Sequence, residues 1–157
     1  VEVMGRNSGF IALDVAIAGG AEGALIPEDR GDWDKVLNHF NNPKRRKKSF
    51  SIIVVAEGDE QGGALILEKK LTSMYPDLKI RSTILGHVQR GGSPSARDRI
   101  LASRLGSEAI NALLEGQRSV TVGIVCDKVV YTPFEQAIEG KKTVSESLIK
   151  LAEILSI

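Results

Sequence analysis

Charged side chains follow three predicted strands of this 157-residue sequence, at points where the chain also carries glycine. Residues 4–6 (MGR) follow the opening VEV, Glu57 ends the apolar run FSIIVVA, and His87 and Arg90 follow the next predicted strand. Arginine forks and protonated histidine bind phosphate well, whereas sugar hydroxyls donate hydrogen bonds and need an acceptor such as a carboxylate. This combination of residues favours a site for a phosphorylated polyol.

Each of these side chains, taken alone, has an ordinary structural explanation. A single loop arginine is most often a solvated charge, and a single histidine is more often a hydrogen-bonded structural group than a catalyst. A glutamate after a strand is common where a helix begins, because carboxylates favour the positive end of the helix dipole. The prediction of a site therefore depends on whether the fold brings the three segments together.

The spacing of apolar residues predicts strands that alternate with helices, which is typical of a parallel α/β sheet. The run FSIIVVA has the nearly continuous β-branched composition of a strand buried on both faces. Ligands of such sheets bind beyond the carboxyl ends of the strands, where the charged residues are expected. Strands are predicted at about 1–3, 23–26, 50–56, 79–85 and 120–126, and helices at about 8–18, 32–42, 62–74, 95–114, 133–139 and 143–155.

Two finer predictions concern the second half of the sequence. Ser93 is expected to cap the long helix, with Pro94 at its first position, because serine and proline are favoured there. The single cysteine, Cys126, lies in the apolar run VTVGIVC, which reads as another parallel-type strand. We therefore expect Cys126 to be a small buried side chain, and an unpaired cysteine fits a reducing compartment.

The charge balance excludes a general attraction to polyanions. The chain has 21 Lys and Arg against 20 Asp and Glu, a net charge of +1. No nucleic-acid or membrane partner is expected on this basis, and no apolar stretch reaches the roughly 18 residues of a membrane helix. The cytoplasm is the expected location. One local exception is the basic run KRRKK at 44–48, which is most often a solvated face and has no aromatic neighbours for base stacking.

Several common catalytic motifs are missing from the sequence. It contains no GxxxxGK[ST], no GxGxxG, no HExxH and no paired cysteines, and no Ser-His-Asp grouping can be read from spacing. Standard nucleotide, zinc and hydrolase sites are therefore not predicted within these residues.

Four segments resemble a known family over nearly the whole chain: VEVMGRNSGFIAL, GGAEGALIPE, VVAEG and ILGHVQRGGSPSARDRILASRLGSEAI. They closely resemble the carboxyl-terminal half of bacterial ATP-dependent 6-phosphofructokinase. The resemblance implies a doubly wound α/β fold with a parallel sheet, of which this chain is one half of a two-domain enzyme. It further implies that residues 1–86 belong to the substrate domain, 87–136 return to the nucleotide-binding domain, and 137–157 form a helical segment that packs back on the substrate domain.

The same resemblance implies roles for individual residues in binding fructose 6-phosphate. Met4 and Gly5 resemble a sugar-contacting turn, with Arg6 close to the transferring phosphoryl group. Glu57 resembles the carboxylate that accepts sugar hydroxyls. His87 and Arg90 match the residues that hold fructose 6-phosphate. Arg81 matches the arginine that reaches into the neighbouring subunit's site, in a homotetramer, to bind the 6-phosphate.

By the same resemblance, the reaction transfers a phosphoryl group from ATP, with Mg²⁺, to the 1-hydroxyl of fructose 6-phosphate in glycolysis. The family's ATP-binding glycines, magnesium aspartate and catalytic aspartate are expected upstream of Val1, so the chain alone is expected to be inactive. An allosteric site for ADP or phosphoenolpyruvate is implied at Arg46 and Lys48, with Glu22 contacting magnesium or the effector.

Three alternatives remain open from the sequence. The donor could be pyrophosphate, because the family's donor is decided largely outside these residues. The chain could instead be a non-catalytic module that binds an anionic ligand or nucleic acid through residues 44–48. It could also belong to an inactive regulatory homologue.

Overall fold

The computed structural model describes residues 1–29, 32–42, 50–140 and 142–155, and the chain divides into two compact units. The first unit combines residues 1–91 with 143–157, and the second comprises residues 92–142. Each unit has its own sheet, one of three strands and one of two. None of the helices in the described ranges has the length and apolar character needed to cross a membrane.

The sheet of the first unit is parallel, as the sequence predicts. Its strands are β1 (Glu2–Val3), β2 (Gly23–Leu25) and β3 (Ile53–Ala56), in the order β1-β3-β2. All four residues of β3 are buried, which confirms the prediction of a strand covered on both faces. The architecture is therefore the predicted α/β fold with a parallel sheet.

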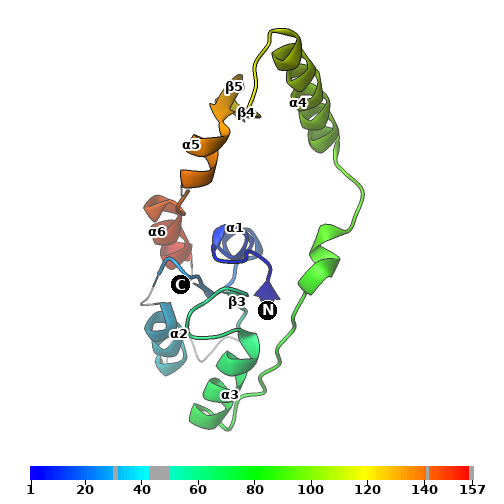
Figure 1. Ribbon diagram of the computed structural model, residues 1–157. Coiled ribbons are helices and arrows are strands. Elements are labelled where there is room, and N and C mark those ends of the chain that lie inside the picture. The colour runs from blue at the N-terminus through cyan, green and yellow to red at the C-terminus, as the bar shows by residue number, and fades with distance from the viewer. Residues whose placement is uncertain (30–31, 43–49, 141, 156–157) are drawn as a thin grey trace. The chain divides into compact units, whose positions relative to one another are not determined.

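Alternate residues of β3 enter two separate hydrophobic clusters, because side chains along a strand point to opposite faces. Val54 and Ala56 pack with α1 (Phe10–Gly19), and residues of α6 (Glu146–Leu155) cover the same cluster. Ile53 and Val55 pack on the other face, against α2 (Asp32–Asn41) and α3 (Ala64–Met74). Figure 1 shows α1 and α3 on opposite sides of β3.

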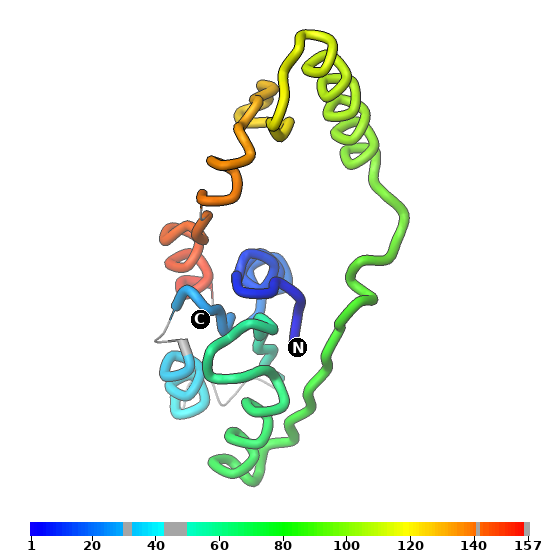
Figure 2. Tube along the Cα trace, viewed as in Figure 1, coloured from blue at the N-terminus to red at the C-terminus, as the bar shows by residue number. Residues whose placement is uncertain are grey.

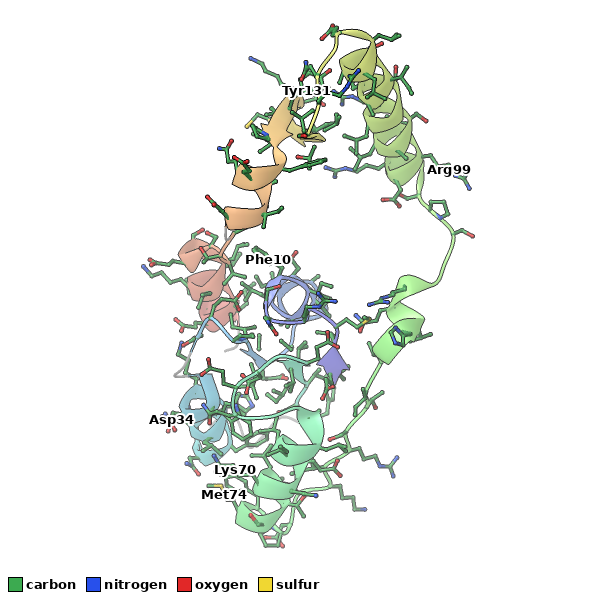
Figure 3. The ribbon with its side chains drawn as sticks, viewed as in Figure 1. Phe10, Asp34, Lys70, Met74, Arg99 and Tyr131 are labelled. Atoms are coloured by element: carbon green, nitrogen blue, oxygen red, sulfur yellow. The ribbon has the colours of Figure 1, made fainter. Side chains whose placement is uncertain are left out.

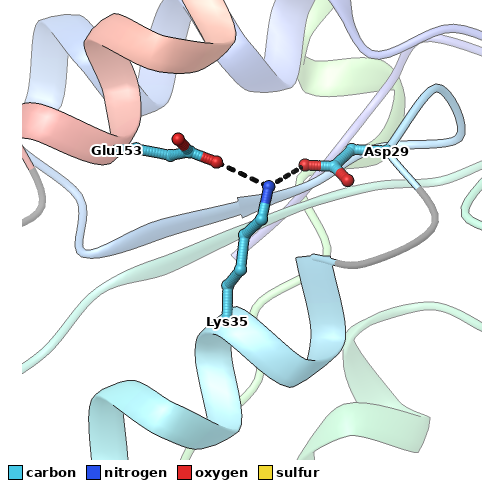
Figure 4. Close-up of polar contacts among 3 residues, drawn as sticks. All are labelled: Asp29, Lys35 and Glu153. Carbon is cyan, nitrogen blue, oxygen red and sulfur yellow. Dashed lines mark hydrogen bonds and ion pairs between the residues drawn. The ribbon is translucent and has the colours of Figure 1, made fainter.

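A lysine joins the chain's last helix to its earlier part. The Lys35 ammonium on α2 lies 2.5 Å from Asp29 Oδ2 and 2.6 Å from Glu153 Oε1 on α6 (Figure 4). Burial lowers the pKa of Lys35, but hydrogen bonds to Asp29 and Glu153 outweigh it and raise the pKa above its ordinary value. The bridge connects two segments of the first unit that are far apart in sequence.

The predicted strand at 79–85 is wrong. After a turn at 76–78, residues 79–85 run past β1 without regular secondary structure (Figure 2), and only one bridge forms, between Glu2 and Ile84, in parallel orientation. Glu2 N–H donates to the Thr83 carbonyl at 2.8 Å, and Leu85 N–H donates to the Glu2 carbonyl at 3.1 Å. Because β1 has only two residues, it offers too few backbone groups for a longer ladder. The predicted strand 50–56 is shortened to 53–56, where β2 and β1 pair with it.

The second unit contains α4 (Ala96–Leu114), β4 (Val120–Val125), β5 (Lys128–Pro133) and α5 (Phe134–Glu139). The prediction of a parallel-type strand at 120–126 is wrong, because β4 pairs antiparallel with β5 in a hairpin. Tyr131 of β5, labelled in Figure 3, donates its hydroxyl to Glu108 of α4 at 2.9 Å. A strand followed at once by its partner needs no crossover helix.

Cys126 is exposed, contrary to the prediction that it is buried. It forms the two-residue hairpin turn with Asp127, and both have positive φ, 49° and 62°. This pair of left-handed residues is the type I′ geometry that matches the twist of the two strands. Arg104 of α4 supports the turn, since its guanidinium donates to Asp127 Oδ1 at 2.6 Å and to the Asp127 carbonyl at 2.9 Å.

Ser95, rather than Ser93, caps α4. Its hydroxyl accepts from Asp98 N–H at 3.3 Å, and the Asp98 carboxylate accepts from Ser95 N–H at 2.8 Å, so the two residues form a capping box. Pro94 consequently precedes the cap and is not the first helical residue. The helix begins at Ala96 because the reciprocal pair satisfies amide groups there.

Candidate functional site

Three chain segments meet at the carboxyl edge of the parallel sheet. Residues 4–6 follow β1, Glu57 follows β3, and η2 (Gly86–Arg90), a 3₁₀ helix, follows the bridge at Ile84. β1 and β3 are parallel neighbours, and β1 also contacts η2. The fold therefore brings together residues that are more than 80 positions apart in the sequence.

Glu57 connects the ends of two strands. Its Oε1 accepts from Arg6 N–H at 2.7 Å and from Gly5 N–H at 3.2 Å. These two amides lower the pKa of the Glu57 carboxyl below its usual value, and the charges of Arg90 and His87 add to the effect. Glu57 is therefore an exposed carboxylate held in its ionised form beside two basic side chains.

His87 and Arg90 lie on the same face of η2, since residues three apart eclipse one another in a 3₁₀ helix. Both are exposed, and both act electrostatically on Glu57. An arginine and a histidine beside an ionised carboxylate suit a ligand with an anionic group and a hydroxyl group close together.

The backbone around Arg6 is closely confined. Arg6 has φ of 52°, in the left-handed region that residues other than glycine rarely adopt. Any side chain at position 58 would overlap the Arg6 carbonyl oxygen, so Gly58 is needed for the close approach of the two segments. The site thus contains a strained residue held by its neighbours.

Gln89 is a site residue to which sequence reasoning assigned no role. Its Oε1 accepts from Met4 N–H at 2.8 Å, which links η2 directly to the end of β1. Gln89 is half-buried, whereas the adjacent Val88 and Arg90 are exposed. The sequence offered one hint: His87 and Arg90 are three residues apart, so in a 3₁₀ helix they share a face and Gln89 lies on a different one.

Comparison with known proteins identifies the family. The family model described as phosphofructokinase matches residues 1–113. The chain belongs to the phosphofructokinase family. The expectation drawn from GHVQRGG and its companion segments is therefore confirmed.

Curated phosphofructokinases resemble the whole chain. It is 50% identical over 157 residues to ATP-dependent 6-phosphofructokinase 2 of Bacteroides thetaiotaomicron, covering 100% of this chain and 48% of that protein. It is 48% identical over 156 residues to the Cytophaga hutchinsonii ATP-dependent 6-phosphofructokinase, covering 99% of this chain and 48% of that protein. The chain therefore spans about half the length of these relatives.

Solved phosphofructokinase structures share the fold. The chain superposes on the phosphofructokinase of Saccharomyces cerevisiae with a TM-score of 0.77 at 34% identity, covering 99% of this chain and 22% of that one. A second match, to T-state phosphofructokinase of Pichia pastoris, has a TM-score of 0.74 at 33% identity, with coverage of 99% and 19%. These likenesses support the phosphofructokinase-like fold class.

Two residues predicted from the family resemblance lie outside the cluster at the strand ends. Arg81 lines a cavity of about 430 Å³ together with Val1 and Ile53, near the amino ends of β1 and β3. Glu22 is 8% exposed and precedes β2, and its Oε2 accepts from Ile52 N–H at 2.6 Å. Their predicted roles, at a subunit interface and in an effector site, stay predictions.

The effector prediction also names Arg46 and Lys48, and both lie outside the described residues. The described ranges contain no group of three or more His, Cys, Asp or Glu side chains arranged to hold a metal ion. The predicted contact of Glu22 with magnesium or the effector stays a prediction.

Proposed function

We propose that this chain supplies the sugar-phosphate-binding half of an ATP-dependent 6-phosphofructokinase. The reaction transfers a phosphoryl group from ATP to the 1-hydroxyl of fructose 6-phosphate and yields fructose 1,6-bisphosphate. One observation carries the proposal: His87 and Arg90 both act on an ionised Glu57 that also holds the Met4–Arg6 turn. Family membership and the names of the relatives support the same reaction.

Each group in the cluster suits one part of this substrate. Arg90 and His87 supply positive charge for the 6-phosphate, and Arg6 is the third basic side chain, closest to the transferring phosphoryl group. Glu57 holds the turn with Oε1, so Oε2 is the oxygen that accepts from a sugar hydroxyl. Met4 and Gly5 shape the surface on which the sugar lies.

The remaining chemistry belongs to the other half of the enzyme. Phosphoryl transfer requires a base for the attacking hydroxyl, a phosphate cradle and a metal that neutralises the developing charge. We place ATP and Mg²⁺ mainly in the part of the relatives that this chain does not span, which is about half of their length. The 157 residues alone are expected to be inactive.

The proposal extends to assembly and regulation. In it, Arg81 contributes to the site of a neighbouring subunit in a homotetramer of the cytoplasm. ADP or phosphoenolpyruvate binds at an effector site that includes Glu22, Arg46 and Lys48. Residues 1–86 and 137–157 form the substrate domain, and 87–136 return to the nucleotide-binding domain; the observed units divide at 91–92 and 142–143.

Replacing Arg90 tests the proposal. In the full-length protein, Arg90→Ala should lower kcat/KM for fructose 6-phosphate by about ten- to a hundredfold, the effect of losing one charged hydrogen bond. The fold should persist, since Arg90 is exposed. Lys150→Ala, which removes an exposed positive charge from α6, is the control and should change kcat/KM by less than about twofold. Wild-type kinetics for Arg90→Ala would contradict the assignment.

The alternatives predict different outcomes. A pyrophosphate-dependent enzyme would turn over with pyrophosphate and not with ATP. A binding module that uses residues 44–48 would bind polyanions with an affinity that falls steeply with salt and does not change on His87→Ala. The binding module does not account for the basic residues gathered at Glu57, whereas a pyrophosphate-dependent enzyme would bind the same sugar phosphate there, so only the donor assay separates it from the proposal.

A further inference from the structure

Three consecutive amides at the end of β1 donate to side chains of other segments. Met4 N–H donates to Gln89 Oε1 at 2.8 Å, while Gly5 and Arg6 N–H donate to Glu57 Oε1. A strand that leaves its sheet normally exposes such amides to water. Here two side chains hold the whole turn, one from the end of β3 and one from η2.

The turn needs this support because Arg6 is strained. Its φ of 52° is unfavourable for a residue with a side chain, so the conformation persists only where surrounding groups enforce it. Glu57 holds the Gly5 and Arg6 amides. Gln89 holds the preceding amide and is the direct link between η2 and the turn.

Gln89 links η2 to the Met4–Arg6 turn from a different face of η2 than the one that carries His87 and Arg90. His87 and Arg90 occupy one side of η2, and the intervening Gln89 side chain lies toward β1. Because Met4 offers an N–H, the Gln89 amide must present its oxygen to it. One short helix therefore displays two basic side chains and is anchored to the segment that carries the third, Arg6.

We infer that Gln89 is a positioning residue, which fixes the Met4–Arg6 turn relative to η2 so that Arg6, His87 and Arg90 act on one substrate. The inference rests on the proposed function. Its physical basis is that groups acting on one substrate must be held at a fixed separation, since small displacements lower the rate strongly.

The test uses Gln89→Met in the full-length protein, because methionine keeps the length of the side chain and removes the acceptor oxygen. We expect kcat/KM for fructose 6-phosphate to fall about tenfold. Exchange of the amides of residues 4–6 should become faster, because the Met4 N–H loses its partner. Val88→Ala is the matched control, since Val88 is 73% exposed on the same helix, and both quantities should stay near the wild-type values.

A double-mutant cycle with Arg6→Ala separates positioning from a general loss of structure. If Gln89 acts through the turn, adding Gln89→Met to Arg6→Ala should lower kcat/KM by less than about twofold further. Additive effects would overturn the inference, as would unchanged exchange at residues 4–6 or wild-type kinetics in Gln89→Met. Exchange requires no turnover, so it still decides whether Gln89 holds the turn if the wild-type protein does not use fructose 6-phosphate and the proposed function fails.

Discussion

Glu57 shows how one side chain can serve both structure and chemistry. The sequence identifies it as a carboxylate at the end of a strand, suited to accept from a sugar hydroxyl. In the structure one of its oxygens already accepts two backbone N–H groups. The hydrogen bonds that lower its pKa also hold Arg6 in the left-handed region.

Glu57 should contribute to stability in a pH-dependent way. Its pKa is lowered in the folded state, first by the Arg6 and Gly5 amides, so the unfolded chain binds its proton more readily. The contribution is therefore present above the unfolded pKa and is lost as the pH falls through the folded pKa. In urea titrations, the difference in the free energy of unfolding between wild type and Glu57→Gln should be largest above the unfolded pKa, about 4.3, and should shrink as the pH falls below it. A difference that does not change with pH would contradict this expectation.

At the scale of elements, the start of α4 shows how local chemistry selects between neighbouring candidates. Ser93 and Ser95 both precede the helical pattern, and both are suitable caps by residue type. Only Ser95 lies three residues before Asp98. The Ser95 hydroxyl accepts from the Asp98 N–H, and the Asp98 carboxylate accepts from the Ser95 N–H. The first helical residue is thus decided by the reciprocal pair.

Two serine substitutions test this assignment. Ser95→Ala should reduce the free energy of unfolding by about 1 kcal/mol, because it removes the acceptor for the Asp98 amide. Ser93→Ala is the matched control and should change it by less than about 0.5 kcal/mol. Urea denaturation, monitored by circular dichroism, measures both values. An equal loss in the two variants would contradict Ser95 as the cap.

At the scale of the whole molecule, the first unit is assembled from two distant parts of the chain. Residues 143–157 return to the unit formed by residues 1–91. Val144 is buried in the cluster beneath α1, and Ile149 and Ala152 pack against it. The Lys35 bridge to Asp29 and Glu153 adds a polar connection at the edge of this contact (Figure 4).

Lys35→Met should modestly reduce the stability of the first unit, because it removes the ion pairs with Asp29 and Glu153. The side chain of Lys35 is 48% exposed and that of Glu153 is 47% exposed, so solvent screens much of the attraction. We expect a loss of about 0.5–1 kcal/mol in the free energy of unfolding, which 1 M salt should largely abolish in a comparison with wild type. Lys150→Met, on the exposed side of α6, is the control and should have little effect. A loss that persists at high salt would show that packing, not charge, is responsible.

The strand predictions that were wrong share a dependence on pairing partners. The segment 79–85 has a strand-like composition but forms one bridge, because β1 is only two residues long. The strand at 120–126 has the composition of a buried parallel strand, yet its partner is the next segment of the chain, and Cys126 consequently lies in an exposed turn. The composition of a segment shows that it can form a strand, whereas the strand it pairs with depends on which other segment the fold places beside it.

By itself, the sequence determined the order of most helices and strands, the parallel sheet and the family, since periodicity and short motifs are local properties. It also identified Arg6, Glu57, His87 and Arg90 as chemically suited to a sugar phosphate. Only the tertiary structure decided how they are held: Gln89 bonded to Met4, and Glu57 to the two amides beyond it. The physical reason is that these bonds join the end of β1 to the end of β3 and to η2, segments distant in the chain whose separation is set by pairing across the sheet rather than by neighbours in the sequence.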